Sequence, residues 1–168
     1  PDDRLARLAE IFGSEKILPA TVSFVDIAGI VRGASEGEGL GNKFLANIRE
    51  ADAICQVVRA FSDDDVVHVE GKVSPAGDIE TIHTELILAD LAVVEKRLER
   101  LAKDLKKTRT ADLEKEQDTL LRCKPHLENG SPLRLLELGG DDRRRLRGFQ
   151  LLSAKPLLLV LNVDEGDL

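Results

Sequence analysis

The chain has 168 residues, of which 42% are hydrophobic and 33% are charged, and its net charge is -7. This amount of apolar sequence argues against wholesale disorder and suffices for a domain with a core, while the excess of charge indicates a solvated helical part. The negative balance excludes a uniformly basic nucleic-acid coat. Two cysteines are too few for a disulfide framework or a zinc site of their own, which favours a reducing, cytoplasmic location.

Two features of the sequence bear on membrane association and on whether the chain is part of a longer protein. Its longest apolar run, 156–161, is far too short to span a membrane, so no membrane partner is expected. Its first residue is Pro1 and it contains no methionine, whereas translation starts at methionine. We therefore expect a processed chain or a piece of a longer protein.

The first part of the chain is predicted to alternate helices and strands. Apolar residues at helical spacing predict a short helix over 2–11 and another over 42–51. Runs of β-branched and apolar residues predict strands over 21–26 and 53–59. Cys55 falls inside the second strand, where we expect a packed core thiol.

Residues 78–130 have a different texture, because charged residues fill the gaps between apolar residues that repeat every three or four positions. A polar break near 107–110 interrupts this heptad pattern. Two apolar stripes joined by a short polar turn predict an antiparallel, coiled-coil helical hairpin. The stripe residues are Leu91, Val94, Leu98, Leu101 and Leu105 before the break and Leu113, Leu120 and Leu127 after it.

The end of the chain returns to the first pattern. A short helix is predicted over 141–151, and the apolar run 157–161 predicts a strand buried on both faces, which is typical of parallel sheets. Strands alternate with helices on both sides of the hairpin, so the sequence predicts an α/β fold with a helical insertion. The expected division is 1–77, 78–130 and 131–168, with the first and last parts in one domain.

The first predicted strand ends at Asp26, which is followed by two small or apolar residues and Gly29. A doubly wound sheet places ligand groups at the carboxyl ends of its strands. In phosphate-loop nucleotidases, an aspartate here belongs to the Mg²⁺ shell and the glycine amide approaches the terminal phosphate. A Cβ at Gly29 would hold the backbone away from that phosphate. The motif is short, and an ordinary strand-to-turn tetrapeptide is the alternative interpretation.

The residues after Asp26 extend this pattern. They read DIAGIVRGASEGEGLGNKFLANIRE over 26–50, and shorter matches continue to Lys155-Pro156. The chain resembles the Obg-like nucleotidases over essentially its whole length, and 37–50 is similar to the YchF subfamily in particular. The resemblance implies a partial phosphate-loop nucleotidase (G-domain) sheet with an inserted coiled-coil hairpin, in agreement with the heptads.

For function, the resemblance implies hydrolysis of ATP or GTP with Mg²⁺, with ATP used at least as well as GTP, and an association with the ribosome in translation or stress responses. It assigns Asp26 to the Mg²⁺ shell, through water, and Gly29 to the nucleotide. The phosphate-loop string Gly-x-x-x-x-Gly-Lys-Ser/Thr does not occur in the chain. In the family it lies upstream and a ubiquitin-like TGS domain lies downstream, so we expect a fragment that is inactive alone.

The position after Gly29 is Ile30. Ras-like proteins carry glutamine there to orient the attacking water, and an aliphatic side chain cannot do so. The resemblance points instead to His68 as the catalytic residue, since histidine can accept or relay a proton near neutral pH. A solvent-facing histidine is the alternative. His83 and His126 are interpreted as ordinary surface residues.

The last strand leads into Asn162, Val163 and Glu165, the candidate residues for nucleotide-base recognition. Guanine-specific relatives carry Asn-Lys-x-Asp, so Val163 replaces the lysine and Glu165 replaces the aspartate. The longer glutamate cannot place its carboxylate in the same position, which removes the strong rejection of other bases. An acidic loop after a strand is the alternative interpretation.

Basic clusters at the hairpin tip and after the hairpin raise RNA as a partner. No aromatic stacking platform accompanies either cluster, and charge runs are usually solvated. The alternative function is a helical module that docks on the ribosome or a protein and has no hydrolysis of its own. The clusters are Lys103, Lys106, Lys107 and Arg109, and Arg143, Arg144, Arg145 and Arg147.

Overall fold

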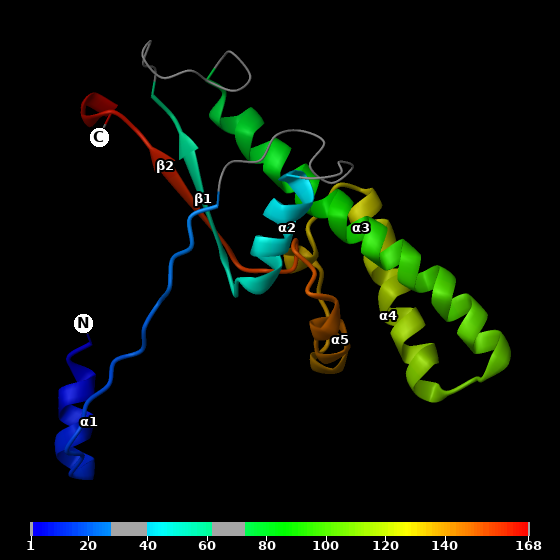
Figure 1. Cartoon of the computed structure of the whole chain (residues 1–168), viewed down its shortest axis with the longest axis horizontal. Coiled ribbons are helices and arrows are strands. Elements are labelled where there is room, and N and C mark those ends of the chain that lie inside the picture. The colour runs from blue at the N-terminus through cyan, green and yellow to red at the C-terminus, as the bar shows by residue number, and fades with distance from the viewer. Residues whose placement is uncertain (1, 28–39, 62–72, 168) are drawn as a thin grey trace.

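The computed structural model of the chain describes residues 2–27, 40–61 and 73–167. It combines a parallel pair of strands with a long helical hairpin, as Figure 1 shows. The elements are α1 (Arg4–Phe12), α2 (Leu40–Glu50), β1 (Ile54–Arg59), α3 (Pro75–Lys107), α4 (Ala111–Glu128), α5 (Gly140–Leu146) and β2 (Leu157–Asn162), with short 3-10 turns at Leu133–Leu135, Arg147–Phe149 and Glu165–Asp167.

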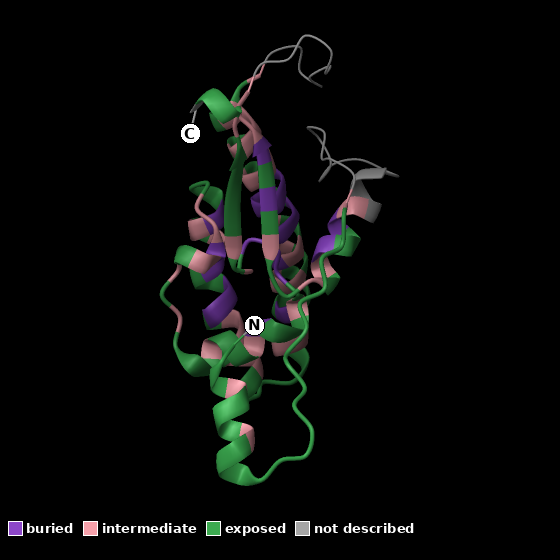
Figure 2. Cartoon of the chain, turned by 90° about the vertical axis from the view of Figure 1, so that its left-hand side faces the viewer, coloured by how far each residue is buried: buried purple, intermediate pink, exposed green. Residues whose placement is uncertain are grey.

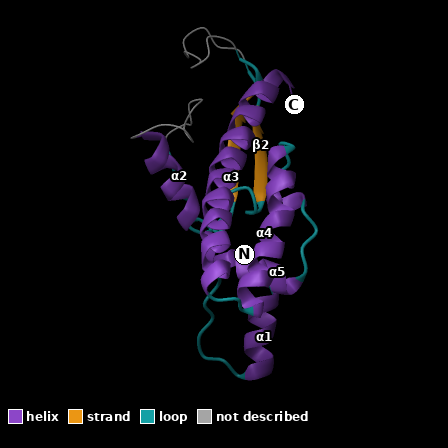
Figure 3. Cartoon of the chain, turned by 90° about the vertical axis from the view of Figure 1, so that its right-hand side faces the viewer, coloured by secondary structure: helices purple, strands orange, loops and turns teal. Residues whose placement is uncertain are grey.

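The helical hairpin predicted from the heptads is confirmed, since α3 and α4 lie side by side (Figures 1 and 3). Helix α3 begins at Pro75, which suits the first turn because its missing N–H would have no partner there. The side chain of Thr110 accepts a hydrogen bond from the Leu113 amide at 3.3 Å and caps α4. The turn between the helices is therefore specified locally by its sequence.

The hairpin core is built from the predicted stripes and from residues outside them. Val94, Leu101, Leu120 and Leu127 are almost completely buried, whereas Leu105 is only half-buried and lies outside the cluster. Apolar residues before and after the stripes complete the core at the base of the hairpin. These are Ile87, Cys123, Leu133, Leu146 and Leu151.

Helix α3 serves two cores, because its first half packs against the sheet and α2. A second cluster joins Leu45 and Ile48 of α2 to Leu86 and Ala89 of α3, with Leu152 just before β2. Figure 2 shows buried residues gathered where helices meet the strands. The single helix α3 therefore crosses the expected boundary at 78, and the proposed division of the chain into domains stays a prediction.

The two strands pair in parallel, as the alternation of helices and strands predicted. Their register pairs Ile54 with Leu157 and Arg59 with Asn162. The inner face of β1 contacts α3. There the side-chain Nε2 of Gln56 donates to the Asp78 carbonyl at 3.4 Å, and Val58 is only 2% exposed. This pairing brings together two segments that the whole hairpin separates in sequence.

Two burial predictions for the strands are wrong. Cys55 is exposed, because side chains alternate along a strand and Gln56 and Val58 take the face against α3. Strand β2 is not buried on both faces, since Leu158 and Leu161 are 62% and 52% exposed. Within the described residues the sheet has two strands, so no further strand or second helical layer covers these side chains.

The predicted strand at 21–26 is also absent. Its backbone is extended but makes no ladder with another described strand, and Phe24 is 83% exposed. A strand forms only where a neighbouring strand takes up its backbone hydrogen bonds. Helix α1 does form near its predicted bounds, yet it buries no residue, and Figure 1 shows it apart from the hairpin. Among the described residues, no helix has the length and apolar character needed to cross a membrane.

Candidate functional site

The carboxyl ends of β1 and β2 meet at one edge of the sheet. Arg59 and Asn162 are partners in the register, and the Ala60 amide donates to the Asn162 carbonyl at 2.8 Å. Val163 and Glu165 follow immediately, with Glu165 opening a short 3-10 turn. Asn162 and Glu165 are exposed and Val163 is half-buried. Three of the predicted nucleotide-binding residues therefore lie together, at the edge where parallel sheets bind ligands.

Arg59 also lies at this edge, although its place in the sequence predicts no role for it. Its Nε donates to the Phe61 carbonyl at 3.0 Å, and its guanidinium lies 4.7 Å from the centre of the Phe61 ring. Both contacts hold the chain as it leaves β1. Only the tertiary pairing with Asn162 brings this arginine to the candidate site.

The other predicted site residues are not brought to this edge by the described structure. Asp26 lies in the exposed extended segment, and the adjacent Ile27 packs against the cluster formed by α2 and α3. Gly29, Ile30 and His68 lie outside the described residues. The structure therefore does not test the expected grouping of Asp26, Gly29 and His68.

Mg²⁺ commonly binds through one or two carboxylates together with phosphate oxygens and waters. Within the described ranges no group of three or more histidine, cysteine, aspartate or glutamate side chains has the arrangement of a metal site. The exposed carboxylate of Asp26 fits a single contact to such an ion, made through water, beside a nucleotide. This chemistry agrees with the expected role of Asp26 and does not demand a ligand cage.

A buried carboxylate lies near the opposite end of β2, before the strand begins. Asp90 of α3 is 1% exposed and accepts hydrogen bonds from the Leu152 amide at 2.8 Å, the Ser153 amide at 2.7 Å and the Ser153 hydroxyl at 2.6 Å. The Ser153 oxygen in turn accepts from the Leu133 amide at 3.2 Å. Burial raises the pKa of the Asp90 carboxyl, while the hydrogen bonds from Ser153 and Leu152 oppose that shift. This network fixes the turn that leads into β2.

Lys155 belongs to the same turn. Its Nζ donates to the Arg49 carbonyl at 3.1 Å and to the Ala51 carbonyl at 2.5 Å, both at the C-terminal end of α2. In the sequence, Lys155-Pro156 is only a match to the family. Neither Asp90 nor Lys155 could be found from spacing, because their partners are distant in sequence and mostly backbone atoms.

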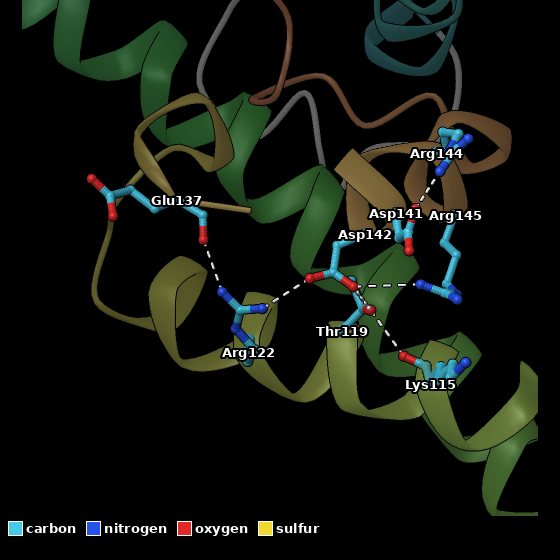
Figure 4. Close-up of polar contacts among 8 residues, drawn as sticks. All are labelled: Lys115, Thr119, Arg122, Glu137, Asp141, Asp142, Arg144 and Arg145. Carbon is cyan, nitrogen blue, oxygen red and sulfur yellow. Dashed lines mark hydrogen bonds and ion pairs between the residues drawn. The ribbon is translucent and has the colours of Figure 1, made fainter. Parts of the chain in front are cut away.

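The second basic cluster is not a free basic surface (Figure 4). Arg144 pairs with Asp141, and the Arg145 guanidinium lies 3.6 Å from the Asp142 carboxylate. Arg143 donates from Nε to the Leu138 carbonyl at 3.2 Å. Three of the four arginines in this cluster therefore have partners within the chain, which removes much of the argument for RNA contact.

Asp142 also attaches α5 to α4. It accepts hydrogen bonds from the Thr119 hydroxyl at 2.9 Å and from Arg122 at 2.9 Å, as Figure 4 shows. Arg122 donates onward to the Glu137 carbonyl at 2.8 Å, and the Lys115 carbonyl, also 2.9 Å from the Thr119 oxygen, shares the single hydrogen of that hydroxyl with Asp142. These charges therefore have a structural use in joining the hairpin to the segment that follows it.

Three other charged or titratable residues have partners that the sequence did not indicate. Arg109 at the hairpin tip pairs with Glu114. His126 is half-buried with its ring 3.1 Å from the Pro132 carbonyl, and His83 is half-buried beside Arg134 at 3.4 Å. Burial and the neighbouring arginine charge lower the pKa of His83. The interpretation of both histidines as ordinary surface residues is therefore wrong.

The parallel strands, the helices beside them and the inserted hairpin make a G-domain-like α/β fold, and comparison with known proteins agrees. Residues 9–109 match the family model described as 50S ribosome-binding GTPase. The ribosome-binding ATPase YchF of Bacillus subtilis (strain 168) is 50% identical over 167 residues, which cover 99% of this chain and 45% of that protein. Its namesake in Haemophilus ducreyi is 52% identical over 165 residues, with 98% and 45% covered.

A solved structure gives the same result. The Schizosaccharomyces pombe YchF GTPase superimposes with a TM-score of 0.77 at 37% sequence identity, over 99% of this chain and 46% of that one. The chain belongs to the 50S ribosome-binding GTPase family, and its expected resemblance to the YchF subfamily is confirmed. It spans less than half the length of the curated relatives cited above, at 45%.

Proposed function

We propose that this chain supplies the base-recognition edge and the hairpin of a cytoplasmic, ribosome-associated enzyme that hydrolyses ATP or GTP with Mg²⁺. The observation that supports it best is the shared carboxyl edge of β1 and β2, where Asn162, Val163 and Glu165 follow the strand. The names of its relatives, which are ribosome-binding ATPases, support both the reaction and the partner. In this proposal Asp26 contacts Mg²⁺ through water and Gly29 contacts the nucleotide.

The base preference follows from the residues at this edge. In a longer protein that carries this sequence, we expect ATP to bind at least as tightly as GTP, because Glu165 and Val163 cannot form the guanine contacts of Asn-Lys-x-Asp. Titration of both nucleotides measures this, and a hundredfold preference for GTP, about 2.7 kcal/mol, would contradict it. Changing Val163→Lys with Glu165→Asp should move the preference toward GTP, whereas Asp164→Asn should leave the ratio of the two affinities unchanged.

We also propose that His68 completes the hydrolytic site, since Ile30 has no polar atom with which to orient water. His68→Ala in the same longer protein should lower kcat at least about tenfold, because a lost general base or water-positioning group costs about 10²–10⁴ in rate. Affinity for a non-hydrolysable analogue should stay nearly constant. Single-turnover hydrolysis and the analogue's Kd are the measurements. An unchanged rate would remove His68 from the mechanism, and a parallel loss of affinity would make it a binding residue.

A second candidate function is a docking module without hydrolysis of its own. The length of α3 and the separate core of the hairpin favour it, because a rigid hairpin can present a surface far from the sheet. A docking module would bind ribosomes equally with and without nucleotide, whereas a switch protein would bind them differently. Sedimentation with ribosomes under both conditions separates the two.

A further inference from the structure

The end of α2, the middle of α3 and the start of β2 meet at one short segment, 152–156. Lys155 is the part of this segment that reaches α2, donating to the Arg49 and Ala51 carbonyls at 3.1 and 2.5 Å. The last carbonyls of a helix have no partner within the helix, and they carry the negative end of its dipole. A half-buried lysine ammonium is therefore well suited to hold the end of α2 in place.

The backbone around Lys155 is itself held from the other side. The Asp90 carboxylate accepts three hydrogen bonds from Leu152 and Ser153, and these three residues are 1%, 0% and 1% exposed. The Lys155 amide donates to the Leu152 carbonyl at 3.2 Å and closes the turn. The backbone that carries Lys155 is therefore attached to α3, so its position does not depend on the contact with α2 alone.

The same segment then enters the sheet. The Ile54 amide donates to the Pro156 carbonyl at 2.9 Å, and β2 begins at the next residue, Leu157. Any displacement of the end of α2 relative to β2 must break or stretch the two hydrogen bonds of Lys155. No other hydrogen bond that the structure describes joins the end of α2 to this segment by a charged side chain.

We propose that Lys155 is a positioning residue that fixes the C-terminal end of α2 relative to β2. This rests on the proposed function, in which Asp26, before α2, contacts Mg²⁺ through water and Asn162, Val163 and Glu165, after β2, contact the base. Lys155 then sets the spacing between the phosphate side and the base side of the nucleotide site, although it touches neither.

Hydrogen exchange of the 168-residue chain tests the structural part. Lys155→Met keeps the aliphatic stem and removes the three N–H donors, so amides 47–51 should exchange about tenfold faster, as expected for the loss of a charge-assisted hydrogen bond. Amides of α3 and α4 should keep their rates. Lys155→Arg should restore much of the protection, because it keeps a charged donor.

Lys124→Met is the matched control, since Lys124 also makes an ion pair, at 2.9 Å with Glu95, but between the hairpin helices. It should leave amides 47–51 unchanged. Unchanged exchange at 47–51 in Lys155→Met would overturn the proposal. Equally faster exchange throughout the chain would also overturn it, because it would show general destabilisation.

The functional part is tested in a longer, nucleotide-binding protein that carries this sequence. Lys155→Met should raise the Kd values of ATP and GTP analogues by the same factor, of at least about threefold. The base-edge substitutions at Val163 and Glu165 should instead change the ratio of the two Kd values. If the unaltered protein bound no nucleotide, the proposed function would fail. The exchange data would still show whether Lys155 holds the C-terminal end of α2. Unchanged Kd values in Lys155→Met would exclude the role in nucleotide binding.

Discussion

Leu120→Ala is expected to lower the free energy of unfolding by about 2–5 kcal/mol. Leu120 is 0% exposed and lies in the cluster that joins α4 to α3. Removing three carbon atoms from a closed core loses their transfer free energy and leaves a cavity that the rigid hairpin cannot fill. Urea denaturation followed by circular dichroism measures the change. The slope of the free energy of unfolding against urea concentration shows whether the surface exposed on unfolding stays the same.

The adjacent Leu121 is the control. It has the same chemistry and the same helix, but its side chain is 52% exposed. Leu121→Ala should change the free energy of unfolding by about 0.5 kcal/mol or less. Equal effects of the two substitutions would show that helix propensity, and not the hairpin core, determines the stability at this point.

Asp90→Asn should cost about 1–3 kcal/mol or more of unfolding free energy at pH 7. All three groups facing the carboxylate are donors, namely two amides and the Ser153 hydroxyl. An asparagine offers one acceptor oxygen and turns an NH₂ group toward one of these donors, which leaves buried donors facing each other. The same substitution at the exposed Asp118 of α4 should have little effect, and a large effect there would point to helix propensity or net charge instead.

The pH dependence of stability gives Asp90 a second signature. Burial raises its pKa above the ordinary value of 3.8, so the folded state binds the proton more tightly than the unfolded state. The contribution of this group to stability is therefore present below about pH 3.8 and is lost as the pH rises through the raised pKa. Asp90→Asn removes this contribution. The free energy of unfolding should be measured against pH for the unaltered chain and for Asp90→Asn. The difference between the two free energies should change across that pH interval and become constant above it.

The sequence by itself determined the features that depend on local periodicity. The repeat that contains Val94 and Leu101 encodes the hairpin, because side chains three and four positions apart share one helix face. Strand β2 and the candidate site residues Asn162 and Glu165 were predicted because an apolar run ending in polar residues is a local signal, and the end of a parallel strand is a general place for ligands. The G-domain class came instead from the resemblance of the motif after Asp26 to a known family.

Only the tertiary structure decided what depends on partners distant in sequence. Residues 21–26 have the composition of a strand but no neighbouring strand within the described residues, and Cys55 is exposed because the pairing of β1 determines which side chains face α3. Asp90 and Lys155 look like ordinary charged residues, since their hydrogen bonds join them to Ser153 and to the end of α2 across long stretches of chain. Periodicity reports which face of an element is apolar. The other elements decide what covers that face, and which backbone groups a buried charge can reach.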